Sequence, residues 1–523
     1  MGGQTMRKAK IFLLNGITMA VAALLLRFIG MGFNVYLSAK LGAEGMGVLS
    51  LLNAVYSLAL TLATSGIGLT CTRLCAEALA RSKGRQARRA LGGCILYSLL
   101  FGFLSAFLLY GLSSPIASRI LNAPACAPYL RTLALSLPAT ALSSCLSGYF
   151  TAIRKASRSA LCALLGQGVK IGLTVLMLSL FYAGGGGVGA VMAATCLSEL
   201  FSGLFSLLLF FPGSKRDLPQ TGARTPRLFV EICSIALPVA FAAWVRSALV
   251  SAEHVLIPKG LMKYGAGSSG ALASYGMMHG MALPVIFFPA ALLSSFTALL
   301  IPEISRFHAE KSEKQIGQTS SRMLRITLLF SIGCAAALLF FGKELGWALY
   351  KNEQVGRMIA LFAPLIPVMY LDTAADAVLK GLDEQVYCMK VNIFDAALSL
   401  LLVYLLVPRI GIAGYVLTVF LSESVNTLFS LMRLYKRTTL HLPLLSCLAL
   451  PLFCALLAAL PPLLVKAPLN ALGALPALIL SLCLYTLCYL LLCTLTGAFT
   501  KEDRRYFKRL LPKEGGLKGH TLR

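Results

Sequence analysis

Long apolar runs, separated by short polar or basic segments, dominate the pattern of this sequence. Each run holds about 20 residues, the length that an α-helix needs to cross the roughly 30 Å hydrocarbon core of a bilayer. We therefore expect an all-α polytopic membrane protein with fourteen transmembrane helices. The runs occupy residues 11–36, 47–72, 91–112, 128–150, 160–182, 187–211, 231–257, 270–300, 323–342, 358–379, 386–407, 411–432, 443–465 and 472–497.

A repeated phrase indicates that the chain is duplicated. Leu-Ser-Glu at 197–199, followed by Leu-Phe-Ser-Leu at 204–207, returns at 421–423 and 428–431, 224 residues later. Each copy lies in the sixth apolar run of its half. Because six spans return a chain to its starting side, both copies enter the bilayer in the same orientation. This arrangement predicts two parallel six-helix lobes with a substrate path between them.

Matched prolines support the duplication. Pro138 and Pro367 occupy corresponding places in the fourth and tenth runs, and a proline bends a membrane helix. The last two runs have no counterpart in the repeat, so we expect them to be an addition to the lobes. The predicted domains are an N-lobe at 1–211, a cytoplasmic linker at 212–230, a C-lobe at 231–437, two further helices at 438–500 and a basic cytoplasmic tail at 501–523.

Composition and charge agree with a membrane protein. Apolar residues make up 58% of the 523 residues, charged residues only 13%, and the mean hydropathy is +0.79. The net charge of +27 would suggest nucleic acid in a soluble protein. Here, however, most basic residues fall in the N-terminus, in alternate loops and in the C-terminal tail, which predicts that both termini lie in the cytoplasm. We expect contact with anionic lipids and no nucleic-acid partner.

Neither a metal site nor catalytic chemistry is indicated. Nearly all of the fifteen cysteines lie in apolar runs, where they are expected to be small buried hydrophobes. Cys71 and Cys75 share a helix face but have no evident further metal ligands. The five histidines are scattered, and no catalytic or nucleotide-binding motif occurs in a plausible context. We expect a transporter without a cofactor, and a monomer.

Arginines inside the apolar runs are the strongest candidates for a binding site. Arg27 lies about 24 Å along its helix from Ile11, and an intramembrane charge is costly unless it faces a cavity. Arg246 occupies the equivalent place in the seventh run. Two guanidinium groups would suit a phosphate ligand, although internal pairing or snorkelling remains an alternative. Lys40 and Lys259, each thirteen residues further on, are weaker candidates for the same site.

Acidic residues inside the apolar runs are candidates for a coupling-ion site. Asp372 and Asp376 are one turn apart and share a face, and Glu253 and Asp395 lie in neighbouring runs. Carboxylates in such positions can bind sodium or carry a proton. The alternative is charge compensation, which is favoured for Glu253 because it lies two turns after Arg246. Glu199 and Glu423, in the repeated phrase, are expected to have a structural role.

Four stretches resemble the stage V sporulation protein B branch of the polysaccharide flippases. They are Arg-Phe-Ile-Gly at 27–30, Leu-Gly-Ala-Glu-Gly-Met-Gly at 41–47, Glu-His-Val-Leu-Ile-Pro-Lys at 253–259 and Met-Ala-Leu-Pro-Val-Ile-Phe-Phe-Pro at 281–289. The superfamily of that branch also contains the lipid II flippases and the multidrug and toxin extrusion antiporters. The resemblance covers the first twelve runs.

The resemblance implies a function in glycan export from the bacterial inner membrane. It implies alternating access and movement of an undecaprenyl-pyrophosphate-linked glycan precursor to the outer leaflet. The cationic cavity of the relatives corresponds to Arg27 and Arg246, and the last two helices would frame a groove for the lipid tail. Transport could be driven by sodium, protons or the membrane potential. Two alternatives stay open: a cation-coupled multidrug antiporter with the same fold, and a membrane-embedded transferase.

Overall fold

The structure is a computed structural model that describes residues 2–81, 84–181, 186–217, 228–440, 445–465 and 473–499. Most of the predicted linker and the predicted tail at 501–523 lie outside these residues. The helices of the first half are α1 (Gly2–Thr64), α2 (Ile67–Ala80), α3 (Gly84–Pro115), α4 (Ala127–Ala134), α5 (Leu137–Ala152), α6 (Ala156–Phe181) and α7 (Gly187–Asp217). Those of the second half are α8 (Leu228–Tyr264), α9 (Ser268–Tyr275), α10 (Leu283–Phe287), α11 (Ala290–Ala309), α12 (Glu313–Tyr350), α13 (Glu353–Phe362), α14 (Ile366–Gly381), α15 (Gln385–Ile410), α16 (Ile412–Arg437), α17 (Leu450–Leu464) and α19 (Ala474–Leu495).

The helices match the predicted spans. Within the described residues, twelve helical stretches are long and apolar enough to cross a membrane, and α4 with α5, bent by 42°, can form a further span. The first of the twelve stretches runs from Ala22 to Ala80 and covers more than half of the first predicted span and all of the second. Gly42 interrupts α1 between them, with φ 69° and ψ −178°. The all-α membrane fold is therefore confirmed, and the helices are consistent with the predicted count of fourteen.

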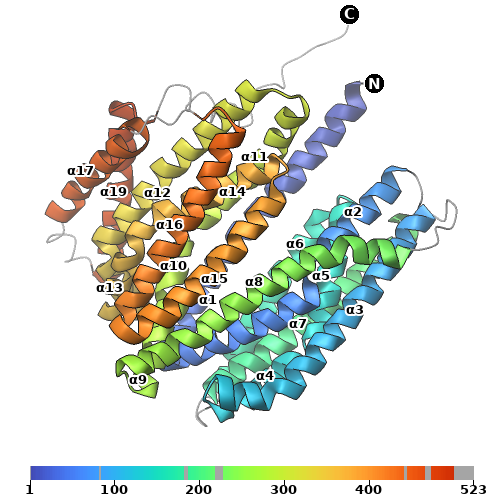
Figure 1. Cartoon of the computed structure of the whole chain (residues 1–523), viewed down its shortest axis with the longest axis horizontal. Helices are drawn as coiled ribbons and strands as arrows, with labels where there is room; N and C mark the ends of the chain where they lie inside the picture. Colours follow the sequence, from blue (N-terminus) through green and yellow to red (C-terminus); the bar gives the residue numbers. More distant parts are fainter. Residues whose placement is uncertain are drawn as a thin grey trace, which may run out of the picture. The chain divides into compact units, whose positions relative to one another are not determined.

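The chain forms two compact units. The first comprises Met1–Ser295 with Met389–Ser422, and the second comprises Phe296–Cys388 with Glu423–Arg523. In the first unit α2, α3 and α5 run side by side (Figure 1) around a buried core that includes Cys71, Cys94 and Cys145. These thiols pack among apolar side chains, as the composition predicts.

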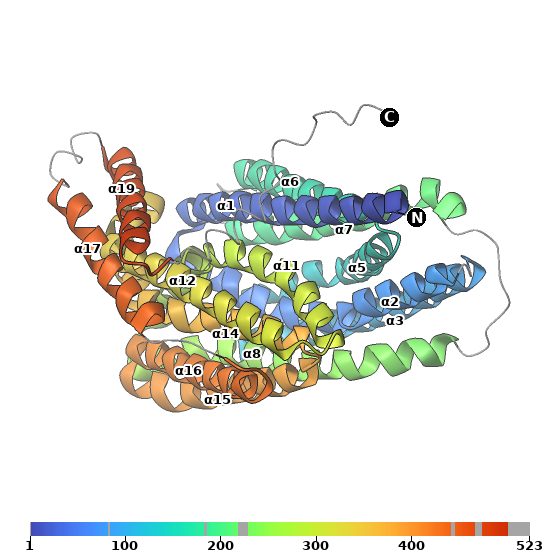
Figure 2. The ribbon, with the colours of Figure 1, turned by 90° about the horizontal axis from the view of Figure 1, so that it is seen from above.

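The last two spans pack against α12 within the second unit. Figure 2 shows α17 and α19 next to each other, and both contribute to one core with α12. The hydroxyl of Tyr489 donates to the carbonyl of Leu329 at 2.7 Å, and that of Tyr485 donates to the carbonyl of Gly333 at 3.0 Å. Buried tyrosines usually find such a partner because an unpaired hydroxyl is costly in an apolar setting.

A close backbone contact joins α1 to α9 in the first unit. A side chain at Gly47 would overlap the carbonyl of Leu272, and one at Gly276 would overlap the backbone of Ala43. Gly276 also begins a π-helical segment, Gly276–Ala282, that connects α9 to α10. Glycine at both positions therefore allows the two helices to approach more closely than side chains would permit.

The duplication appears in the contacts between helices. Ser143 of α5 and Ser206 of α7 share a hydrogen bond of 3.1 Å. In the second half, Asp372 of α14 accepts a hydrogen bond of 3.0 Å from Ser430 of α16. Ser430 follows Ser206 by the spacing of the repeated phrase, and Asp372 follows Ser143 by the spacing of the matched prolines. Corresponding helices, α5 with α7 in the first half and α14 with α16 in the second, are therefore joined at corresponding points. The second half has an aspartate where the first has a serine.

Candidate functional site

Arg27 lines a cavity of about 480 Å³ in the first unit. The α1 side of the cavity is one helix face, because its residues recur at intervals of three and four. Polar side chains from two helices face the cavity together with Arg27, and an aromatic ring closes part of it. The lining residues are Leu26, Arg27, Gly30, Met31 and Asn34 of α1, Ala163 and Gln167 of α6, and Pro284 and Phe288.

The composition of this cavity suits a ligand with both an anionic and an apolar part. Asn34 and Gln167 add amide donors and acceptors to the guanidinium of Arg27. The ring of Phe288 packs edge-on against Phe28 at a centroid distance of 4.8 Å, which holds an apolar wall beside the arginine. The guanidinium of Arg27 presents paired N–H donors, which can bind two oxygens of one phosphate group.

Arg246 has a different environment. Like Arg27, it is exposed, but it lies on α8 and is not among the residues that line the Arg27 cavity. Its charge acts on the carboxylate of Asp395. The next residue, Ser247, donates a hydrogen bond of 3.2 Å to Thr61 of α1. The structure therefore places the two arginines in the same unit but not around this one cavity.

The two candidate lysines lie at helix ends. Lys40 is exposed and lies two residues before the break at Gly42. Lys259, near the end of α8, donates a hydrogen bond of 3.4 Å to the backbone carbonyl of Arg119. Neither lysine lines the Arg27 cavity. Their shared position near a helix end is compatible with snorkelling toward the membrane surface.

Glu253 lies beside a second carboxylate in the first unit. Its side chain accepts a hydrogen bond of 2.9 Å from the hydroxyl of Ser399 on α15. The charge that acts on it is that of Asp395, also on α15, rather than that of Arg246. One oxygen of Asp395 is buried and has no hydrogen-bond partner in the described part of the chain. Two carboxylates and a hydroxyl are therefore gathered between α8 and α15.

Asp372 and Asp376 contact other side chains of the second unit. Besides its bond from Ser430, Asp372 accepts one of 3.1 Å from the side-chain amide of Asn426. Asp376 is only 8% exposed and forms an ion pair of 3.1 Å with Lys380, one turn later on α14. The two aspartates share a helix face as predicted, and both are engaged by neighbouring donors.

A cluster of aromatic and imidazole rings was not anticipated from the sequence. The imidazole of His254 and the hydroxyl of Tyr275 share a hydrogen bond of 2.9 Å. The ring of His279 lies 4.6 Å from that of His254 and 5.3 Å from that of Tyr415. Tyr275 and His279 are four residues apart, a spacing that places two side chains on one helix face. His254 of α8 and Tyr415 of α16 reach them only through the packing of the helices, for which the sequence offers no signal.

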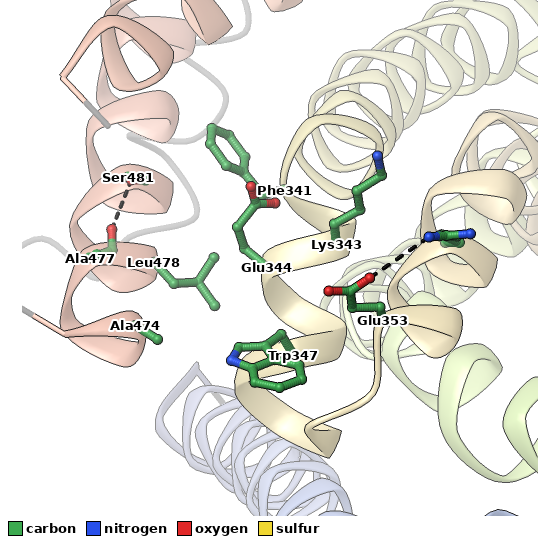
Figure 3. A pocket seen from close by; sticks show the side chains of 10 residues that line it. Phe341, Lys343, Glu344, Trp347, Glu353, Ala474, Ala477, Leu478 and Ser481 are labelled. Atoms are coloured by element: carbon green, nitrogen blue, oxygen red, sulfur yellow. Dashed lines mark hydrogen bonds and ion pairs between the residues drawn. The ribbon is translucent and has the colours of Figure 1, made fainter. Parts of the chain in front are cut away.

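Another cavity, of about 350 Å³, lies between α12, α13 and α19 in the second unit (Figure 3). Trp347 supplies an aromatic wall. Acidic and basic side chains are balanced around it, with Lys343 and Arg357 against Glu344 and Glu353. Glu353 and Arg357 form an exposed ion pair of 3.7 Å. This balance does not favour an anion, so the Arg27 cavity is the better candidate for a phosphate ligand.

An ion cluster connects α16 to the turn before α15. Arg433 donates hydrogen bonds of 2.8 and 2.9 Å to the two carboxylate oxygens of Glu384, and Arg437 lies 2.6 Å from the same group. Because the donors from Arg433 stabilise the ionised carboxylate, the pKa of Glu384 is lowered from its ordinary value. All three charges of the cluster are engaged with one another, which favours a structural role over a binding site.

Comparison with known proteins agrees with the fold. Over 422 residues the chain is 24% identical to stage V sporulation protein B of Bacillus subtilis (strain 168), which covers 78% of this chain and 80% of that protein. The lipid II flippase MurJ of the same organism is 23% identical over 434 residues, with 77% and 78% covered. Both relatives match across most of their length.

Solved structures give the same fold at lower identity. A structure of the lipid II flippase MurJ in an inward closed conformation matches with a TM-score of 0.65 and 12% identity, and covers 93% of this chain and 99% of that chain. An inward-facing multidrug resistance MATE family transporter of the MOP superfamily matches with a TM-score of 0.63 and 17% identity, and covers 80% of this chain and 98% of that chain. At these identities the likeness concerns the fold alone.

Two family models match the chain. The model for lipid II flippase MurJ matches residues 280–482. The model for polysaccharide biosynthesis proteins matches residues 12–308, more than half of the chain. This region includes Arg27, the whole Arg27 cavity and Glu253. The chain therefore belongs to the polysaccharide biosynthesis protein family, with the membrane fold that MurJ and MATE transporters share.

Proposed function

We propose that the protein is a flippase for lipid-linked glycan precursors, and not an enzyme. The observation that carries the proposal is the Arg27 cavity, in which one guanidinium lies among amides and an apolar wall. A pyrophosphate-linked glycan presents the matching groups: an anionic pyrophosphate, sugar hydroxyls and a polyprenyl chain. The names of the family and of its relatives, a sporulation protein and a lipid II flippase, support the same substrate class.

We propose that transport runs from the inner to the outer leaflet of the bacterial cell membrane. The distribution of Lys and Arg supports an orientation with both termini in the cytoplasm. A pyrophosphate diester carries about two negative charges, and outward movement of one charge releases roughly 2.3 kcal/mol per 100 mV of inside-negative potential. The membrane potential can therefore drive export, provided that Arg27 does not move across the membrane with the substrate.

The coupling ion, where one is used, is proposed to bind at Glu253 and Asp395. These carboxylates and the hydroxyl of Ser399 provide several oxygen ligands in one place, and hard cations prefer oxygen ligands. Asp372 and Asp376 remain a second candidate pair. Their existing bonds to Ser430, Asn426 and Lys380 favour a structural role.

A cation-coupled multidrug antiporter is the alternative function. The structural likeness to a MATE transporter supports it. The drugs such antiporters carry are mostly cations, however, and a cavity with Arg27 as its charged lining residue repels them. The charge of the cavity therefore favours the anionic lipid-linked substrate.

Transport of a labelled substrate tests the proposal. The full-length protein is reconstituted in proteoliposomes with a fluorescent lipid-linked pyrophosphate sugar, and transfer between leaflets is followed by quenching from one side. We expect Arg27→Ala to abolish transfer and Arg27→Lys to restore little of it, because an ammonium lacks the paired donors of a guanidinium. Arg73→Ala, which removes an exposed arginine paired with Glu77, is the control. Full transfer by Arg27→Ala would refute the proposal.

A further inference from the structure

A second cationic cavity lies in the second unit, at the beginning of α12. Its volume is about 890 Å³, and no residue that lines it also lines the Arg27 cavity. One helix face supplies most of its wall: Lys314, Gln318 and Arg322 follow one another at intervals of four, and Arg325 lies three residues further. Thr439, shortly after the end of α16, contributes to the opposite side.

The charge of this cavity is strongly one-sided. Lys314, Arg322 and Arg325 are positive, and Glu313, in the exposed first turn of α12, is the one acidic residue among the described residues that line it. At 1.5 Å per residue the three cations extend over about 16 Å of the helix. Both arginines are half-buried, so part of each side chain lies within the wall of the cavity.

The position of the arginines places them at a membrane boundary. The predicted ninth apolar run begins at residue 323, directly after Arg322, and Arg325 lies in its first turn. Lys314 and Gln318 precede the run and belong to the polar end of the helix. If the bilayer begins where this run begins, the arginines lie at the depth of the lipid headgroups, where arginines contact phosphates readily.

A glycine shapes the wall opposite the arginines. A side chain at Gly317 would collide with the hydroxyl and carbonyl of Thr439. Because glycine is present, the chain that follows α16 lies directly against α12 and closes one side of the cavity. The hydroxyl of Thr439 and the amide of Gln318 then add hydrogen-bonding groups to those of the cations. The cavity is therefore enclosed on two sides rather than being a flat charged surface.

We propose that this cavity binds a phosphate group, supplied by the headgroup of an anionic membrane lipid. The two guanidinium groups offer paired donors that match phosphate oxygens. Its volume lies within the range of small-molecule sites, and its boundary position favours a ligand held in the membrane. A bound lipid would connect the start of α12 to the segment after α16. A soluble phosphate compound has the same recognition chemistry, so the test separates the two sources.

Lipid retention provides the first measurement. The full-length protein in detergent is mixed with dioleoyl phosphatidylglycerol or with zwitterionic dioleoyl phosphatidylcholine, and bound lipid is counted by native mass spectrometry. We expect selective retention of phosphatidylglycerol. The Arg322→Gln, Arg325→Gln double variant should have an affinity for phosphatidylglycerol that is lower by about tenfold, equivalent to about 1.4 kcal/mol. Arg306→Gln, which removes an exposed arginine of α11 that pairs with Glu310 just after the helix, should bind as the parent does.

A second measurement separates lipid from soluble phosphate. Inorganic pyrophosphate is added to the same proteins, and the melting temperature is recorded. A pyrophosphate-dependent rise in the parent, absent from the double variant, with equal retention of phosphatidylglycerol by both, would overturn the lipid assignment and favour a soluble ligand. Selective lipid loss without a response to pyrophosphate supports the proposal as stated. Equal behaviour of parent and double variant in both measurements refutes a phosphate site.

A charge-conserving variant guards against misfolding. If the double glutamine variant does not fold, Arg322→Lys with Arg325→Lys keeps both charges and should retain lipid more weakly than the parent, because each ammonium lacks the paired donors. Unchanged retention in this variant would contradict recognition by guanidinium groups. Binding is measured without transport, so the result does not depend on the flippase proposal.

Discussion

The carboxylate of Asp372 accepts a hydrogen bond of 3.0 Å from the hydroxyl of Ser430, at the point where Ser143 and Ser206 meet in the other half of the chain. An aspartate at this point can accept from two donors, and Asn426 provides the second. The duplication has therefore kept the contact between the helices while its chemistry has changed. The acidic version is expected to hold its helices more strongly.

This difference predicts unequal losses of stability. Asp372→Asn and Ser430→Ala should each lower the free energy of unfolding by about 1 to 2 kcal/mol, since a bond to a charged group is lost or weakened. Ser143→Ala, the matched control in the first half, should cost about 1 kcal/mol or less. Melting temperatures of the purified variants in detergent measure the difference. A larger loss for Ser143→Ala would contradict it.

Glu253→Gln should alter the ion dependence of transport. The variant removes one of two neighbouring carboxylates while the amide can still accept from Ser399. The measurement compares transport by parent and variant across sodium concentrations and pH values. Asp372→Asn is the comparison variant, and we expect it to keep the parental ion dependence. If Asp372→Asn changes the ion dependence and Glu253→Gln keeps it, coupling is assigned to Asp372 instead.

Gly276→Ala should be strongly destabilising. Its new Cβ would overlap the backbone of Ala43, and overpacking of this kind typically costs about 1 to 3 kcal/mol. Gly92→Ala is the control because a Cβ at Gly92, within α3, meets nothing within 4 Å. Alanine there should stabilise the helix by about 0.5 to 1 kcal/mol. Equal melting temperatures for the two variants would show that α1 is not in close contact with the segment that begins at Gly276.

The ion cluster at Glu384 predicts a loss of stability at acid pH. The pKa of this carboxyl is lower in the folded protein than its ordinary value of 4.5. Its contribution is therefore fully present above the unfolded pKa and is lost as the pH falls through the folded pKa. Glu384→Gln lacks this pH-dependent contribution to stability. Its melting temperature should therefore change less than that of the parent below about pH 5. If the melting temperatures of the two proteins fall in parallel as the pH is lowered, the ion cluster does not stabilise the folded protein.

The spans and the duplication could be predicted from the sequence because both depend on local patterns. Apolar run length determines whether a helix can cross the bilayer, and repeated phrases keep their spacing whatever the packing. The position of Arg27 along its helix likewise follows from the sequence alone. Its place at a cavity with Gln167 of α6 and Phe288 depends on how helices pack, which spacing does not specify.

The partners of the acidic residues could not be predicted for the same reason. The two-turn spacing suggested that Glu253 pairs with Arg246, yet the structure gives it Ser399 and Asp395, on a helix more than 140 residues away. Arg246 acts on Asp395 instead. Side chains on one helix face compete with those of every neighbouring helix, and only the packing decides which contact forms.

The bonds from Tyr485 and Tyr489 to α12 determine how α19 can move. The acceptor carbonyls, at Gly333 and Leu329, are one helical turn apart, as are the two tyrosines. A shift of α19 along α12 by one residue would break both bonds at once, and both tyrosines are buried in an apolar core, where an unpaired hydroxyl is costly. Sliding between these helices is therefore resisted at two points, and α12 and α19 should move as a single rigid body in any conformational cycle.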